Sequence, residues 1–119
     1  PDMKSYKPAA PFNVPLILLQ PTYSNVLGVE KKTFPPASEG KLFYGSFKTF
    51  GGTERDVNGV FSLENTAVID CWYRPDIKAD CHIVVRSTGM EYEIIGEPEN
   101  INMQNQYLKF KVIGVKGGA

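Results

Sequence analysis

The chain has 119 residues and a mass of 13.2 kDa, and 42% of its residues are hydrophobic. This is the size of one domain, 1–119, and the apolar fraction suffices for a core without a metal or disulfide bonds. Thirteen basic and thirteen acidic residues give a net charge of zero, which excludes a strongly basic nucleic-acid-binding protein and a polyacidic tail.

The N-terminal third of the chain is rich in proline. Most of the nine prolines lie between residues 1 and 36, and proline lacks the backbone N–H that a strand ladder needs. We therefore expect an extended, mobile N-terminal arm over residues 1–12. Residues 14–20 are predicted to form the first strand, whose apolar run contains Pro15 and is too short to span a membrane. Residues 25–34 are predicted to form one further strand.

Strands are predicted through most of the remaining chain. Residues 41–50 are rich in aromatic side chains, which favour half-buried strands. Residues 66–74 alternate with the period of a strand that has one buried face. The other expected strands, separated by turn residues including 98–106, are 81–86, 91–96 and 107–115. This spacing predicts an all-β fold, a small antiparallel barrel of about six strands or a sandwich.

One segment interrupts the spacing of the strands. Residues 51–65 are polar, contain glycine and exceed the usual length of a connection. The segment is interpreted either as a surface hairpin without a function or as a functional loop, and residues 60–63 could form a short strand when supported by neighbours. The sequence thus predicts one long flexible loop inside the domain.

The two cysteines and the single histidine make a poor metal site. Cys71 and Cys81 are interpreted as reduced, packed thiols, and a disulfide bond between neighbouring strands is the alternative. Together with His82 they would not supply the four ligands of a tetrahedral zinc site. We expect no metal and no cofactor.

Few residues are arranged for catalysis. His82 lies within a strand pattern and is interpreted as a structural residue rather than as a base. The pairs Glu91/Glu93 and Glu97/Glu99 each share a strand face, so each pair could bind a cation or act as acid and base. Exposed strand glutamates also serve solubility and protect sheet edges. We expect a protein that is not an enzyme.

Lysine and tyrosine side chains suggest an alternative function. Single-stranded nucleic acid is bound by basic grooves that carry aromatic side chains. The candidates in this chain are Lys31, Lys32, Lys48, Lys109, Lys111 and Lys116, with Tyr44, Tyr73 and Tyr107. Acidic residues balance these lysines, so an OB-like single-stranded nucleic-acid-binding module is the alternative function.

Several short motifs resemble a known family. They are the run WYRPDI at 72–77, then Asp80, Ile83-Val84, YEII at 92–95 and Asn100-Ile101, preceded by FKTFGGTE at 47–54. Over about residues 40–116 they resemble the head–tail joining family of tailed bacteriophages, the head-closure or stopper proteins. The family pattern has an arginine near Asp80 where this chain has Cys81 and His82, and the N-terminal third matches it less well.

The resemblance implies a β-barrel with one long internal loop and a structural role. Such proteins form a ring of identical subunits below the portal and adaptor rings, at the head–tail interface of a virion assembled in the bacterial cytoplasm. The ring closes the head channel after DNA packaging and meets the end of the packaged double-stranded DNA without sequence preference. It also offers a surface to the tail terminator or tail-completion protein. No membrane partner is implied.

Two sets of residues are predicted to serve this role. The channel-closing loop would contain Gly51, Gly52, Thr53, Glu54, Arg55, Asp56, Asn58 and Gly59. The interface with neighbouring subunits or the adaptor would contain Tyr6, Phe12, Trp72, Arg74 and Asp76. Interface cores favour tryptophan, tyrosine and arginine. For Trp72 the alternative is that it covers one end of the barrel, and for Asp76 that it forms a turn.

Overall fold

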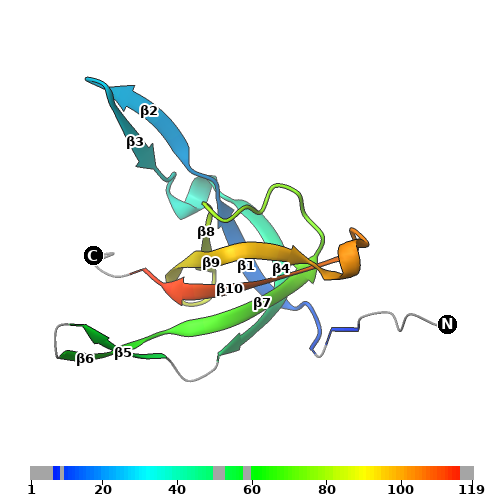
Figure 1. Ribbon diagram of the computed structural model, residues 1–119. Coiled ribbons are helices and arrows are strands. Elements are labelled where there is room, and N and C mark those ends of the chain that lie inside the picture. Colours follow the sequence, from blue (N-terminus) through cyan, green and yellow to red (C-terminus); the bar gives the residue numbers. More distant parts are fainter. Residues whose placement is uncertain (1–6, 9, 50–52, 58–59, 116–119) are drawn as a thin grey trace.

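Six strands of the chain close into an antiparallel barrel (Figure 1). The computed structural model describes residues 7–8, 10–49, 53–57 and 60–115, with the backbone alone over 53–57 and 60–64. The barrel strands are β1 (Val14–Leu19), β4 (Lys41–Thr49), β7 (Thr66–Trp72), β8 (His82–Val85), β9 (Glu91–Asn100) and β10 (Tyr107–Gly114). Their order around the barrel is β1-β4-β7-β10-β9-β8. The predicted all-β barrel of six strands is confirmed.

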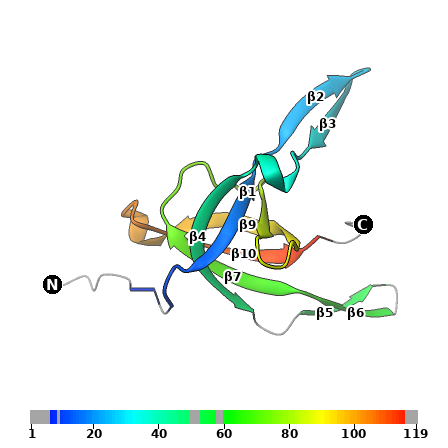
Figure 2. The same cartoon turned by 180° about the vertical axis from the view of Figure 1, so that it is seen from behind.

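The other described elements are two hairpins and two short helical turns. The hairpins pair β2 (Thr22–Val26) with β3 (Val29–Thr33) and β5 (Thr53–Val57) with β6 (Val60–Glu64), and the 3-10 turns are η1 (Ala37–Glu39) and η2 (Ile101–Met103). Both hairpins extend away from the barrel (Figures 1 and 2). Across the described parts of the chain, no helix has the length and apolar character of a membrane span.

The barrel core is built from the inward faces of the six strands. The predicted inward face of β7 is confirmed, because Ala67, Ile69 and Cys71 are fully buried. The opposite face is not uniformly exposed, since Thr66 and Asp70 are buried as well. β4 pairs with β7, and at Gly45 the two strands are so close that a Cβ atom there would lie 2.6 Å from the carbonyl oxygen of Asp70. Cys71 and Cys81 are both free and buried, as the sequence predicted, and burial raises the pKa of the Cys71 thiol to about 12.

The single strand predicted over residues 25–34 is wrong. β2 and β3 pair in antiparallel register with Val26 opposite Val29, so the chain reverses at Leu27 and Gly28. These two residues have φ values of 52° and 80°, the positive pair that a two-residue type I′ hairpin turn requires. Leucine rarely adopts this conformation, so only the glycine of the usual two-residue turn signal is present in the sequence.

The predicted long loop contains a paired hairpin. The β5–β6 hairpin lies beyond the barrel, where β6 leads into β7 (Figures 1 and 2), with Thr53 opposite Glu64 and Val57 opposite Val60. Antiparallel pairing supplies hydrogen-bond partners to backbone N–H and C=O groups that would otherwise need water as their partner. Of the predicted loop residues, Thr53, Glu54, Arg55 and Asp56 lie in β5, whereas Gly51, Gly52, Asn58 and Gly59 lie outside the described residues.

Strand β9 is longer than predicted and contains a bulge. It continues past the expected end at residue 96 to Asn100, and its register with β10 shifts between Lys109 and Lys111. Gly96 has a φ of 74°, which bends the strand at the shift. Pro98 therefore falls where the ladder is interrupted, so its missing N–H leaves no ladder bond unmade. The expectation that residues 98–106 form one connection is wrong for the first three of them.

Candidate interaction surfaces

Aromatic side chains form a row across the outer face of β4, β7 and β10. Trp72 lies opposite Tyr107 in the β7–β10 register, and their rings stack at a centroid distance of 5.2 Å. Gly45 pairs with Cys71, which brings the neighbouring Tyr44 beside Trp72. Trp72 remains 57% exposed. We call Tyr44, Trp72 and Tyr107 the aromatic row.

The end of the N-terminal arm packs on the aromatic row of its own chain. The ring of Phe12 meets Trp72 edge-on at 5.6 Å and Tyr107 at 6.0 Å. Two predicted interface residues, Phe12 and Trp72, are thus brought together, and Tyr6 lies outside the described residues. Trp72 lies on the outer face and is not a core residue, so it is available to a partner over the part that Phe12 and Tyr107 leave uncovered.

Replacing Trp72 with alanine is expected to lower the free energy of unfolding by about 1–2 kcal/mol, through loss of the aromatic contacts. A buried aromatic residue would cost about 3–5 kcal/mol instead. Urea unfolding followed by circular dichroism measures the difference. Trp72→Phe is the matched control, because it keeps a ring against Tyr107 and should cost less. A loss above 3 kcal/mol would place Trp72 in the core.

Arg74 and Asp76 form a pair within the turn that follows β7. The Arg74 Nε and Nη2 atoms donate hydrogen bonds of 3.1 and 2.8 Å to the two carboxylate oxygens of Asp76. The same guanidinium lies 5.3 Å from the centre of the Phe43 ring, and Lys41 Nζ is 3.8 Å from Asp76. The hydrogen bonds from Arg74 lower the pKa of Asp76. The two predicted interface residues therefore satisfy each other, and Asp76 also has the turn role considered for it.

Asp76→Asn is expected to cost about 1 kcal/mol at neutral pH, because the pair with Arg74 is partly exposed. The folded pKa of Asp76 is lowered, so its contribution is present above the ordinary aspartate pKa of about 4 and is lost as the pH falls through the folded value. Unfolding curves between pH 7 and pH 2 should therefore converge for the parent and the variant at the acidic end. A difference that does not shrink with falling pH would contradict this assignment.

His82 is held between an acid and an aromatic ring. Its Nδ1 atom is 2.6 Å from a carboxylate oxygen of Glu91, and its ring stacks on Phe34 at 3.7 Å. A carboxylate can orient an imidazole for acid–base chemistry, but here the contacts join the segment before β4 to strands β8 and β9. No cluster of three or more metal-ligating side chains occurs among the residues described.

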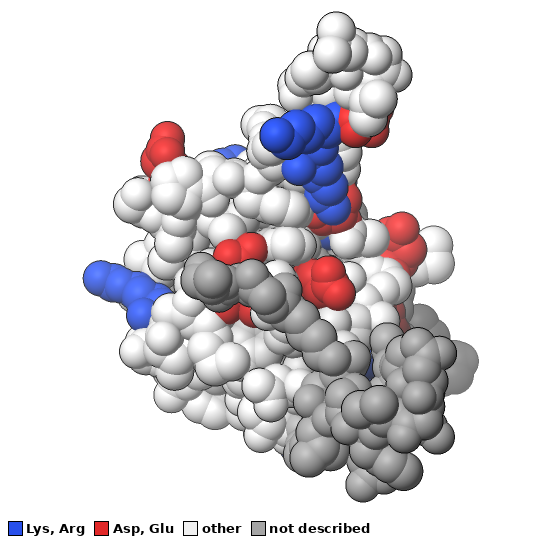
Figure 3. Space-filling view, turned by 90° about the vertical axis from the view of Figure 1, so that its left-hand side faces the viewer, with Lys and Arg blue, Asp and Glu red and all other residues white. Residues whose placement is uncertain are grey.

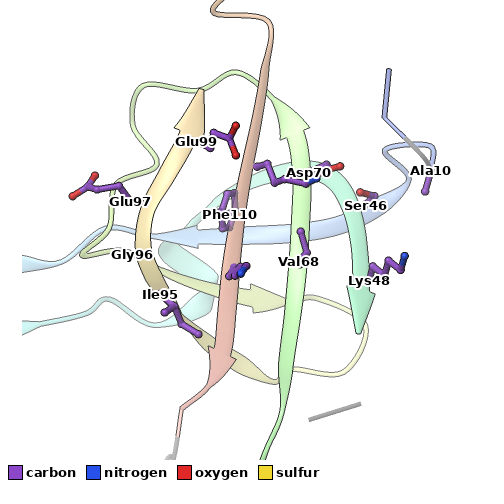
Figure 4. A pocket seen from close by; sticks show the side chains of 12 residues that line it. Ala10, Ser46, Lys48, Val68, Asp70, Ile95, Gly96, Glu97, Glu99 and Phe110 are labelled. Carbon is purple, nitrogen blue, oxygen red and sulfur yellow. The ribbon is translucent and has the colours of Figure 1, made fainter. Parts of the chain in front are cut away.

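A groove lies on the outer face of β4, β7, β10 and β9 (Figure 4). Its volume is about 520 Å³, and it is lined by Ala10, Ser46, Lys48, Val68, Asp70, Ile95, Gly96, Glu97, Glu99, Lys109, Phe110 and Lys111. We call it the outer groove. Its position depends on the bulge in β9, since Gly96 turns the strand there. No local pattern in the sequence indicates this groove, because it depends on a bulge at a position where the sequence predicts the end of a strand.

The lysines proposed for nucleic-acid binding are divided between two places. Lys48, Lys109 and Lys111 line the outer groove together with Asp70, Glu97 and Glu99. Lys31 and Lys32 lie on β3 in the projecting hairpin, and Lys116 lies outside the described residues. The described lysines are therefore interspersed with acids rather than gathered in one basic strip.

Comparison with known proteins supports the fold. No family model matches the sequence, and no curated protein matches it. Among solved structures, the solution structure of protein SF1141 from Shigella flexneri 2a is similar, with a TM-score of 0.60 and 16% identity. The similarity covers 91% of this chain and 96% of that chain. At this identity the likeness shows that the two chains share a fold over nearly their whole lengths.

Proposed function

We propose that this chain is a non-enzymatic subunit of a ring that completes the head of a tailed bacteriophage. The ring lies below the portal and adaptor, closes the DNA channel after packaging and presents a surface to the tail terminator or tail-completion protein. The motifs between residues 47 and 101 that resemble the head–tail joining family support this proposal. The barrel agrees with the fold that the resemblance implies.

The β5–β6 hairpin is the observation that carries the proposal. A segment that closes a channel needs a base fixed to the barrel and an end that projects away from the barrel. The base is β4 paired with β7, from Gly45 opposite Cys71 to Thr49 opposite Ala67. The hairpin continues from these strands for five residues on each side, a reach of about 17 Å at the usual rise of a strand. Copies in a ring would direct these hairpins toward a shared axis.

The outer surface of the barrel supports self-association. A ring with one kind of subunit needs two different surfaces on each copy that fit one another. The aromatic row and the outer groove lie on β4, β7, β9 and β10, whereas the β2–β3 hairpin projects from elsewhere (Figures 1 and 2). A net charge of zero places little electrostatic barrier between copies.

The test uses DNA-filled heads that lack tails. Purified protein is added to the heads, and DNA release and tail attachment are measured with and without it. We expect the treated heads to retain DNA and to accept tails. Heads that leak DNA as fast as untreated heads, with no protein bound, would contradict the proposal.

The aromatic row favours one second candidate, an OB-like module that binds single-stranded nucleic acid. Stacked and exposed rings such as Trp72 are used by single-strand binders. Trp72 is the single tryptophan of the chain, so its fluorescence reports binding of an oligonucleotide directly. This function requires quenching that weakens steeply as salt is raised. Absent or salt-insensitive quenching would remove it.

A further inference from the structure

The N-terminal arm is held on the barrel by side-chain contacts. Phe12 contacts the rings of Trp72 and Tyr107. The other arm residues that line a hollow beside these two rings are Pro8, Ala10 and Pro11. Among the described residues before β1, none forms a backbone–backbone hydrogen bond with the barrel. The prolines contribute to this, since proline has no backbone N–H to donate. The arm can therefore leave its site without breaking a strand ladder.

The residues on the aromatic row have the composition of a ligand for an aromatic surface. Pro8 and Pro11 have the spacing Pro-x-x-Pro, and Phe12 follows directly. Proline-rich segments favour the extended polyproline II conformation, lose little entropy on binding and bind grooves that are lined by aromatic side chains. The aromatic row is therefore suited to an extended segment of this kind, and in the single chain its own arm lies there.

The arm covers the aromatic row only in part. Trp72 is 57% exposed and Tyr44 is 49% exposed although Phe12 lies beside them. A hollow of about 430 Å³ remains between these three rings. Ala10 also lies at the rim of the outer groove (Figure 4), so the arm runs between the two surfaces. Apolar surface that stays exposed on both sides of a bound segment favours a contact with another chain.

The arm itself is the segment that the structure shows to fit this surface. It lies at the right-hand end of the molecule in Figure 1, whereas the opposite face carries both acidic and basic side chains (Figure 3). The net charge of the chain is zero, so charge places little barrier between copies. Every copy of the chain carries both the arm and the aromatic row. A second copy is therefore a partner that brings the fitting segment.

Exchange of arms between copies would retain the contacts of the single chain. Each arm would still pack on a Trp72 and a Tyr107, and contacts between the two barrels would be added. Asn13 is exposed and is the single residue between Phe12 and β1, so the backbone would change direction there. Because Phe12 is two residues from Val14, exchange brings the aromatic row of one copy beside the start of β1 in the other.

We propose that Pro8, Pro11 and Phe12 of one copy bind the aromatic row of the next copy in the assembled ring. In the isolated chain the same residues cover the row of their own barrel. The arm and the row are different surfaces, so the contact is head-to-tail, and each copy both gives an arm and receives one. This inference rests on the part of the proposed function that requires copies to join, and it names the contact that joins them.

The fluorescence of Trp72, the single tryptophan, detects an arm that arrives from another copy. The acceptor is full-length Phe12→Ala protein, whose own arm lacks the ring that packs on Trp72. The donor is full-length Trp72→Ala protein, which has an intact arm and no tryptophan. We expect the donor to shift the emission of the acceptor to shorter wavelength, toward that of the parent, because Phe12 of the donor displaces water from the indole.

The matched control donor carries Trp72→Ala and Phe12→Ala together. It differs from the donor by the one ring that is proposed to move, so at the same concentration it should shift the emission at least about tenfold less. A short tether holds a segment at an effective concentration in the millimolar range, so the titration extends to about 1 mM donor. No shift up to this concentration, or equal shifts with the two donors, would overturn the proposal.

A peptide with the sequence of residues 1–12 gives a second test. It contains no tryptophan, so Trp72 again reports its binding. We expect it to shift the emission of Phe12→Ala protein, and the parent should need about tenfold more peptide for the same change in Trp72, because its own arm competes. Equal midpoints for the two proteins would mean that the arm does not occupy the row, which overturns the proposal.

The fluorescence titration and the head-closure experiment separate two failures. If the donor shifts the emission of the acceptor but the parent protein does not retain DNA in heads, the arm contact stands and head completion is wrong. If the parent protein retains DNA but the two donors act alike on the acceptor, head completion stands and the arm contact is wrong.

Discussion

Replacing residues 51–65 with an Asn-Gly turn is expected to leave a folded barrel that still binds to heads but no longer retains their DNA. β4 and β7 remain paired up to Thr49 and Ala67, and two residues between residue 50 and Thr66 preserve this register. The inserted glycine takes the place of Asn65, whose carbonyl accepts the Gly114 N–H at 2.8 Å. Asn-Gly is favoured in two-residue hairpin turns, so the strands can be joined without strain. Circular dichroism, urea unfolding and DNA release from heads measure the three parts of this expectation.

A variant with the same chain length shows whether channel closure needs the pairing of β5 with β6 or only a segment of that size. In it residues 51–64 become a Gly/Ser linker, which is flexible and does not form a stable hairpin. If the paired β5–β6 hairpin closes the channel, this variant should also release DNA. A shortened variant that retains DNA as well as the parent would show that the hairpin is not the plug. Loss of folding would show that the segment belongs to the barrel.

Ile69→Ala is expected to lower the free energy of unfolding by about 2–5 kcal/mol, because the substitution leaves a cavity in the core. Ile69 is fully buried at the centre of β7, opposite Phe47 on β4 and Phe110 on β10. A loss of this size is a large part of the total stability of a small domain. Urea unfolding at equilibrium measures it.

The matched control for this substitution is Ile95→Ala. Ile95 is the same residue type on a neighbouring part of the sheet but is 44% exposed on the outer face. At low protein concentration its replacement should cost less than about 1 kcal/mol. Equal losses at the two positions would contradict the inward and outward faces described for the barrel.

The sequence predicted those strands whose pattern is local. The alternation around Ile69 identifies the buried face of β7 without knowledge of its partners. The β2–β3 turn was missed because Leu27 occupies a position where asparagine or glycine is usual. The extension of β9 was missed because Pro98 was interpreted as a break, and only the register with β10 shows that it follows a bulge.

The candidate surfaces could be predicted only in part, because they join distant residues. The strand pattern predicts Trp72 as an interface residue, because it lies among charged neighbours. Its stacking on Tyr107 depends on the pairing of β7 with β10, which no local pattern reveals. The contact with Phe12 depends on the path of the arm over the barrel. Arg74 and Asp76, both predicted as interface residues, lie two positions apart in one turn and bond to each other.

The strand order of the barrel has a consequence for biosynthesis. β10 comes last along the chain but lies between β7 and β9, and β1 comes first but pairs with both β4 and β8. On the ribosome the barrel therefore cannot close until β10 has emerged, and one edge of β1 stays unpaired until β8 has been synthesised. Because such non-local pairing slows folding, we expect refolding on the millisecond-to-second scale typical of small all-β domains.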